Sequence, residues 1–96
     1  MRIIAGSLRG RRLNPPDNLP VRPTTDMARE SLFNILNNYV EYEECSVMDL
    51  FAGTGQLGIE CLSRGAKSVT FVDKSKDAIA IVKDNLKTCG AEGKVV

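Results

Sequence analysis

The chain has 96 residues, of which 43% are hydrophobic and 26% are charged, and its formal net charge is only +1; these values are typical of one small globular domain. No apolar run approaches the roughly 20 residues that a membrane-spanning helix needs, and the N-terminus lacks a signal-peptide core, so we expect a cytoplasmic protein. Three widely spaced cysteines and the absence of histidine disfavour a metal site and a disulfide framework, and favour buried or half-buried thiols.

Positive charge is concentrated at the N-terminus. Five arginines and one acid give residues 1–24 a formal charge of +4, whereas eight cations and 11 acids give the remainder −3. Because the guanidinium group forms forked hydrogen bonds with phosphate, this pattern favours a nucleic-acid contact, although a solvated basic hairpin accounts for the charge equally well. The candidate nucleic-acid-binding residues are Arg2, Arg9, Arg11 and Arg12.

The first 23 residues predict a small β-hairpin followed by an extended connector. Residues 2–13 contain two short pieces, RIIAG and RGRRL, which are separated by Ser7-Leu8 and contain the turn-forming residues Gly6 and Gly10. Prolines then recur up to Pro23, and each of them restricts the backbone to extended conformations. We therefore divide the chain into a basic hairpin with its connector, residues 1–23, and a main domain, residues 24–96.

A helix is predicted to begin at Thr24-Thr25-Asp26, because these side chains suit helix capping. Apolar residues then recur at helical spacing and predict one inward face. They are Ala28, Leu32, Ile35, Leu36, Tyr39 and Val40.

The rest of the chain alternates between strands and helices. We expect strands at 46–51 and 68–73, a helix at 57–64 closed by Gly65, a helix from Ser75 to about residue 88 ended by Gly90, and the start of a third strand at 94–96. This order predicts an α/β, Rossmann-like fold with a parallel sheet, right-handed crossovers and helices on its faces. Because parallel sheets are normally covered, we expect either a longer parent protein or self-association through an exposed sheet edge.

The segment Gly53-Thr54-Gly55-Gln56-Leu57-Gly58 matches the GxGxxG pattern of nucleotide-binding turns. Asp73 lies 20 residues after Gly53 and is placed to accept hydrogen bonds from ribose hydroxyls. Its alternative role is an acid at a helix N-terminus, paired with Ser75. Up to this point the pattern fits NAD as well as S-adenosylmethionine. Gly58 favours helix packing, and Glu60 either interacts with the helix dipole or approaches the pocket.

Asp49 favours S-adenosylmethionine, because it stands four residues before Gly53 at the end of a predicted buried strand. A carboxylate there repels the pyrophosphate of a dinucleotide, whereas it attracts a sulfonium and an α-ammonium group. A structural cap on the glycine turn is its alternative role.

These residues resemble the class I methyltransferases, and more narrowly the RsmD-type enzymes, which methylate the exocyclic N2 of a guanine in bacterial small-subunit ribosomal RNA. The resemblance runs through RIIAGSLRGRRL, VRPTTDMARESLFNIL, DLFAGTGQLGIECLSRGA and VTFVDKS. Family members usually place glutamate where Asp73 stands.

The resemblance implies S-adenosylmethionine as cofactor and ribosomal RNA or the small ribosomal subunit as partner, with the basic hairpin facing the RNA. Asp73 would bind ribose, and Arg22, Thr24 and Thr25 would fold over the cofactor from the connector. Helix capping, to which Thr24 and Asp26 are well suited, is the alternative role of residues 22–26. Lys74 stands where adenine would lie, or is a solvated lysine. The implied cofactor-binding residues are Asp49, Phe51, Gly53, Thr54, Gly55, Asp73, Lys74, Arg22, Thr24 and Thr25.

The family's Asn/Asp-Pro-Pro-Tyr/Phe motif, which grips the target amine, is missing. Asn14-Pro15-Pro16-Asp17 has the wrong position and lacks the aromatic residue. We therefore expect no catalytic residue here and an inactive chain that represents the N-terminal, cofactor-binding part of such an enzyme. The alternatives are an NAD-linked oxidoreductase fragment and a non-catalytic RNA-binding or assembly module of the same fold.

Overall fold

A computed structural model describes residues 2–13, 25–50 and 52–96. Strands and helices alternate after a first helix, as the sequence predicts. The described elements are α1 (Asp26–Leu36), a 3₁₀ turn (Tyr42–Glu44), β1 (Ser46–Asp49), α2 (Gln56–Ser63), β2 (Ser68–Phe71), α3 (Lys76–Thr88) and β3 (Lys94–Val95). The strands form one sheet in the order β1-β2-β3, and both pairings are parallel. The predicted Rossmann-like α/β fold is confirmed.

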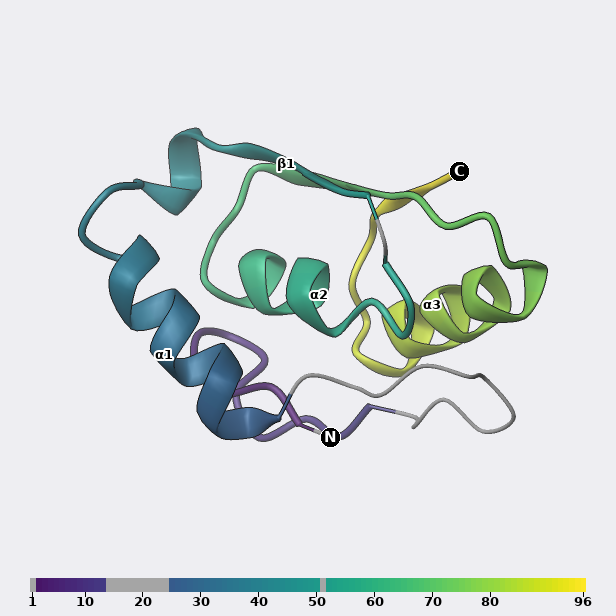
Figure 1. The fold of residues 1–96 in the computed structure, drawn as a ribbon, viewed down its shortest axis with the longest axis horizontal. Coiled ribbons are helices and arrows are strands. Elements are labelled where there is room, and N and C mark those ends of the chain that lie inside the picture. The colour runs from purple at the N-terminus through teal and green to yellow at the C-terminus, as the bar shows by residue number, and fades with distance from the viewer. Residues whose placement is uncertain (1, 14–24, 51) are drawn as a thin grey trace.

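The described helices all lie on one face of the sheet, not on both (Figure 1). Val47 pairs with Val69, Asp49 with Phe71, and Phe71 in turn with Val95, so the strands advance across the sheet in one direction. Right-handed crossovers that advance in one direction place their helices on the same side. The opposite face carries Met48, whose exposed fraction is 64%.

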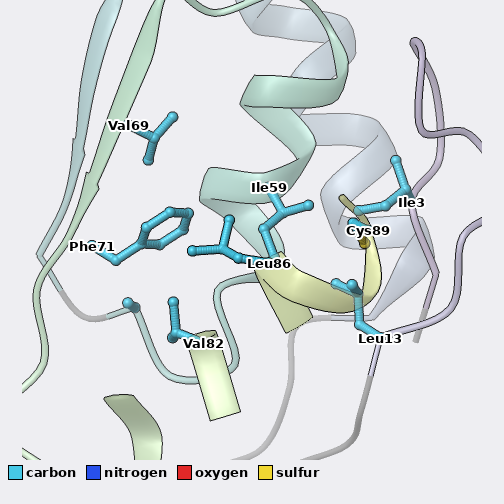
Figure 2. Packing of buried hydrophobic residues seen from close by; sticks show 9 residues of the cluster. Ile3, Leu13, Ile59, Val69, Phe71, Val82, Leu86 and Cys89 are labelled. Carbon is cyan, nitrogen blue, oxygen red and sulfur yellow. The ribbon is translucent and has the colours of Figure 1, made fainter. Parts of the chain in front are cut away.

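The core runs from the sheet through the helices to the N-terminal segment (Figure 2). Gly58 allows α2 to approach β2 closely, because a Cβ atom at this position would lie 2.2 Å from Cε1 of Phe71. This confirms the predicted packing role of Gly58. The buried cluster comprises Ile3, Leu13, Ala52, Ile59, Val69, Phe71, Val82, Leu86 and Cys89.

The N-terminal segment is not a regular hairpin, which corrects the prediction. Within residues 2–13, Arg2 and Arg12 form an isolated antiparallel bridge, and the Ile3 amide donates to the Arg11 carbonyl at 2.9 Å. The intervening chain turns, and Gly6 has a φ of 85°, a conformation that favours glycine. Several amides of this segment donate hydrogen bonds to α2 instead of across a hairpin, and this limits the pairing between its two strands.

The predicted inward face of α1 is wrong. Arg29 and Phe33 are the buried residues, whereas Ile35 and Tyr39 have exposed fractions of 59% and 80%. A buried arginine is recognised poorly from apolar spacing, because its burial depends on an acid from a distant element, here Glu60. The helix also ends at Leu36, before Tyr39 and Val40.

The ends of the other helices agree with the predictions. Gly65 follows α2 with a φ of 110°, and the Ser75 hydroxyl accepts a hydrogen bond from the Ala78 amide at the start of α3. The inward face of α3 is confirmed by the burial of Ala78, Val82 and Leu86. The cysteines are free thiols; Cys89 is buried, and Cys45 and Cys61 are half-buried, as predicted. Among the described helices, none combines the length and apolar character needed to cross a bilayer.

Candidate functional site

The glycine turn connects the end of β1 to the start of α2. Gly53 and Gly55 have φ values of 57° and 83°, and Gly55 is the N-cap residue of α2. A Cβ atom at Gly55 would lie 3.3 Å from Cγ1 of Val82, so this turn packs closely against α3. Within the described residues no side chain caps the start of α2. The first amides of this helix and its positive dipole end therefore suit an anionic or hydrogen-bond-accepting group.

Asp73 braces this turn. Its Oδ2 atom accepts a hydrogen bond from the Gly53 amide at 3.0 Å, and its Oδ1 atom accepts one from the Ser75 amide at 2.9 Å. The Ser75 contact bears out the alternative role as an acid at a helix N-terminus. Each carboxylate oxygen has a second lone pair, so Asp73 keeps the capacity to accept hydrogen bonds from hydroxyl groups.

Asp49 lies at the same edge of the sheet as the glycine turn. It is the last residue of β1, and its carbonyl accepts the Val72 amide at 2.8 Å, which keeps the two chain segments together beyond the strands. The residue is half-buried and its Oδ2 atom is inaccessible to solvent. The two acids that the sequence predicts for a nucleoside pocket therefore lie at the carboxyl ends of neighbouring parallel strands, Asp49 as the last residue of β1 and Asp73 two residues after β2. This edge is where α/β sheets bind ligands.

The carboxylate of Asp49 also acts on α2. Burial raises the pKa of the Cys61 thiol from its ordinary value of 9.0 to about 11, and the negative charges of Asp49 and then Glu60 add to this shift. Asp49 is therefore within electrostatic reach of the helix that follows the turn.

Asn85 is a site residue that sequence reasoning missed. It is fully buried in α3, and its Nδ2 atom donates to the carbonyl of Thr54 in the glycine turn at 2.9 Å. Thr54 is itself only 5% exposed. The signal was a lone amide next to Leu86 on the inward face of α3.

The structure supports a cofactor contact less directly for the remaining predicted residues. Thr25 is the N-cap of α1, where its hydroxyl accepts the Ala28 amide at 3.1 Å; sequence reasoning favoured Thr24 and Asp26 as caps. Lys74 is exposed. Phe51, Arg22 and Thr24 lie outside the described residues.

The four candidate nucleic-acid-binding arginines lie on the N-terminal segment, and all are exposed. Arg2 and Arg9 line a cavity of about 220 Å³, together with Ile3, Ile4, Gly10 and Glu30. The N-terminal segment that carries them lies on the side of α2 that faces away from the sheet (Figure 1).

A protein-family model described as conserved hypothetical protein 95 matches residues 1–96. The chain belongs to this family, that of the RsmD-type methyltransferases. The chain is 47% identical to the ribosomal RNA small subunit methyltransferase D of Haemophilus influenzae, over 96% of this chain and 48% of that protein. It is 43% identical to the protein of the same name from Escherichia coli K12, over 95% of this chain and 45% of that protein.

A solved structure has the same fold. A hypothetical protein of Thermus thermophilus superposes with a TM-score of 0.86 at 32% identity, over 100% of this chain and 54% of that one. The predicted resemblance to the RsmD-type family is thus confirmed. This RsmD-type chain spans about half the length of the curated relatives that it matches.

Proposed function

We propose that this chain forms the S-adenosylmethionine-binding part of an enzyme that methylates the exocyclic N2 of a guanine in small-subunit ribosomal RNA. One observation carries the proposal: Asp49 and Asp73 flank one glycine turn at the carboxyl edge of the sheet, and Asp73 is bonded to that turn. The methyltransferase names of the relatives support the reaction class.

The residues present fit S-adenosylmethionine. The Asp49 carboxylate suits the α-ammonium group and the sulfonium charge, the start of α2 suits the α-carboxylate, and Asp73 suits the ribose hydroxyls. When bound, the cofactor supplies a methyl group activated by the positive sulfur. We propose that Gly53 and Gly55 shape the turn, and that buried Thr54 contributes through its backbone. Side-chain contacts from Lys74, Thr25, Arg22, Thr24 and Phe51 stay predictions.

An NAD-linked role is disfavoured by the same geometry. A pyrophosphate over the glycine turn would lie next to the half-buried Asp49 and would be repelled by its charge.

Calorimetric titration with S-adenosylhomocysteine and, in parallel, with NAD tests the proposal. We expect saturable binding of the first alone; saturable binding of NAD alone would reverse the assignment.

We propose that the exposed arginines of the N-terminal segment contact the ribosomal RNA. We also propose that the protein acts in the cytoplasm, where this RNA is found. Because the sequence lacks the Asn/Asp-Pro-Pro-Tyr/Phe motif, we expect RNA binding by this chain without methyl transfer. Filter binding and a methyl-transfer assay on the same RNA separate this expectation from its alternatives. Methyl transfer by the chain alone would show that the missing motif is dispensable, whereas RNA binding without any S-adenosylhomocysteine binding would favour the non-catalytic module.

Within residues 2–13, 25–50 and 52–96, β1 is an edge strand and no helix covers the face that carries Met48. Both features bear on self-association, which stays a prediction. Met48 and Leu50 have exposed fractions of 64% and 56%, and exposed strand edges favour pairing with other chains. Sedimentation velocity over a range of concentrations measures this directly, and a strictly monomeric profile at high concentration would contradict it.

A further inference from the structure

A buried carboxylate in α2 holds the N-terminal segment. Glu60 is fully buried, and its two oxygens accept the amides of Ile4 at 2.9 Å and of Ala5 at 3.1 Å. Arg64 donates to the same carboxylate at 3.0 Å, and Arg29 lies 3.5 Å from it. Neither role considered from the sequence applies, because Glu60 is turned toward residues 4 and 5.

One turn further along α2, Ser63 holds the next part of the segment. Its hydroxyl accepts the Leu8 amide at 2.9 Å and donates to the Ala5 carbonyl, and its own carbonyl accepts the Ser7 amide at 2.7 Å. Gly6 passes so close that a Cβ atom there would lie 1.9 Å from the Ser63 carbonyl oxygen. The segment is therefore docked on α2 through main-chain groups, at consecutive turns of one helix.

The N-terminal end of the same helix lies at the glycine turn. Gly55 is the N-cap of α2, and Ser63 is its last residue. Eight helical residues span about 12 Å, and a helix this short is rigid along its axis. The candidate cofactor turn and the arginine-bearing segment are thus fixed to the two ends of one element.

Burying the Glu60 carboxylate costs desolvation free energy, so its presence in the core calls for a specific structural reason. Burying a charge is favourable only when its partners are well placed, and an apolar side chain is often at least as stabilising. A carboxylate, however, selects one path of the chain, because only that path brings two successive amides to its two oxygens.

We propose that Glu60 and Ser63 are positioning residues, which hold the N-terminal segment so that Arg9, Arg11 and Arg12 meet the RNA at a set distance from the cofactor turn. The inference rests on the proposed RNA methyltransferase function. It assigns to α2 a second role besides presenting its first turn to the cofactor.

The experiment compares the full chain with Ser63→Ala, Glu60→Gln and a control, Val69→Ala. Val69 is buried in β2, and Figure 2 shows it on the opposite side of Ile59 from Ile3 of the N-terminal segment, so this variant reports the effect of lost stability alone. Three readouts are collected: binding of fluorescently labelled small-subunit ribosomal RNA, calorimetric binding of S-adenosylhomocysteine, and hydrogen exchange of the Ile4, Ala5 and Leu8 amides.

For Ser63→Ala, which removes both hydrogen bonds of the hydroxyl, we expect faster exchange of the Leu8 amide and RNA binding weaker by about fivefold or more. The affinity for S-adenosylhomocysteine should be unchanged. Glu60→Gln should have a larger effect of the same kind, and Val69→Ala should leave RNA affinity unchanged.

RNA affinity equal to wild type in Ser63→Ala, despite faster exchange, would overturn the positioning role and leave the proposed function intact. A wild-type chain that binds no RNA would instead overturn the proposed function together with the inference. Because Ser63→Ala removes only one oxygen atom, the test holds even if Glu60→Gln does not fold.

Discussion

Asp73 reaches across to Gly53: the aspartate Oδ2 atom accepts the glycine amide at 3.0 Å, although the residues are 20 positions apart. Its other oxygen accepts the Ser75 amide at the start of α3. One carboxylate therefore joins the loop after β1 to the loop after β2. The acid proposed to bind ribose also sets the shape of the turn beside it.

Replacing Asp73 by asparagine should weaken both the hydrogen bonds that hold the glycine turn and the proposed binding of the cofactor. An amide group keeps one accepting oxygen and presents an NH₂ group to the other backbone donor, so we expect a loss of about 1–2 kcal/mol in unfolding free energy. Binding of S-adenosylhomocysteine should weaken by about tenfold or more. Urea denaturation and calorimetry measure the two effects.

The matched control for this change is Asp77→Asn, which removes an exposed acid from the first turn of α3. It should leave the affinity for S-adenosylhomocysteine unchanged. If Asp73→Asn binds this ligand as tightly as the wild type, Asp73 has no part in cofactor binding and serves only as a brace.

Replacing Asp49 by asparagine should separate charge from shape. The side chain keeps its size but loses its attraction for the ammonium group, so we expect S-adenosylhomocysteine to bind about tenfold more weakly. Calorimetric titration measures this affinity. Binding of S-adenosylhomocysteine as tight as in the wild type would contradict the assignment of Asp49.

Replacing Asn85 by alanine should loosen the glycine turn from the side of α3. The change removes the donor to the buried Thr54 carbonyl, and the loss of one intramolecular hydrogen bond costs about 0.5–1.5 kcal/mol. Thermal unfolding and S-adenosylhomocysteine titration are the measurements. A variant of wild-type stability would show that this hydrogen bond does not hold the turn.

Replacing Gly58 by alanine should destabilise the fold by overpacking, by about 1–3 kcal/mol. The added methyl would lie 2.2 Å from Cε1 and 2.8 Å from Cζ of Phe71. Combining it with Phe71→Leu tests the cause, since the double variant should be more stable than the sum of the single changes implies. Strict additivity in denaturant unfolding would place the clash elsewhere.

The Cys61 thiol should make the fold sensitive to alkali. Burial and, less strongly, the charges of Asp49 and Glu60 raise its pKa from 9.0 to about 11, so the folded chain binds this proton more tightly than the unfolded chain does. The resulting stabilisation is complete below pH 9 and is lost as the pH rises through the folded pKa of about 11.

Cys61→Ala lacks this titrating group and serves as the comparison. Between about pH 8 and about pH 10.5, the wild type should lose more unfolding free energy than Cys61→Ala loses. Urea midpoints at both pH values measure the difference. Parallel losses in the two proteins would show that the thiol does not titrate differently on folding.

The order of strands and helices could be predicted because it depends on local signals. Apolar runs, the Ser75 cap and the glycines after α2 and α3 act within a few residues, and the structure confirms them. The inward face of α1 could not be predicted, because the burial of Arg29 depends on long-range partners, the Arg2 carbonyl at 2.7 Å and the Glu60 carboxylate at 3.5 Å.

The same reasoning separates the parts of the candidate site. The GxGxxG pattern and the two acids could be found from their spacing, but the brace between Asp73 and Gly53 depends on two parallel strands meeting in register. The hairpin was predicted from glycines and short apolar pieces, whereas the amides of Ile4 and Ala5 are bonded to Glu60 instead. Long-range partners of this kind leave no periodic trace in the sequence.

The docking of the N-terminal segment through backbone groups has a consequence for how recognition can diversify. Since α2 grips amides and carbonyls, the side chains at Arg9, Arg11 and Arg12 are exposed and are not needed to define the path of the chain. Their identity can drift or be engineered while the loop keeps its course. The backbone of the segment is thus fixed while its exposed side chains can change, so new substrate preferences can arise without a change in the fold.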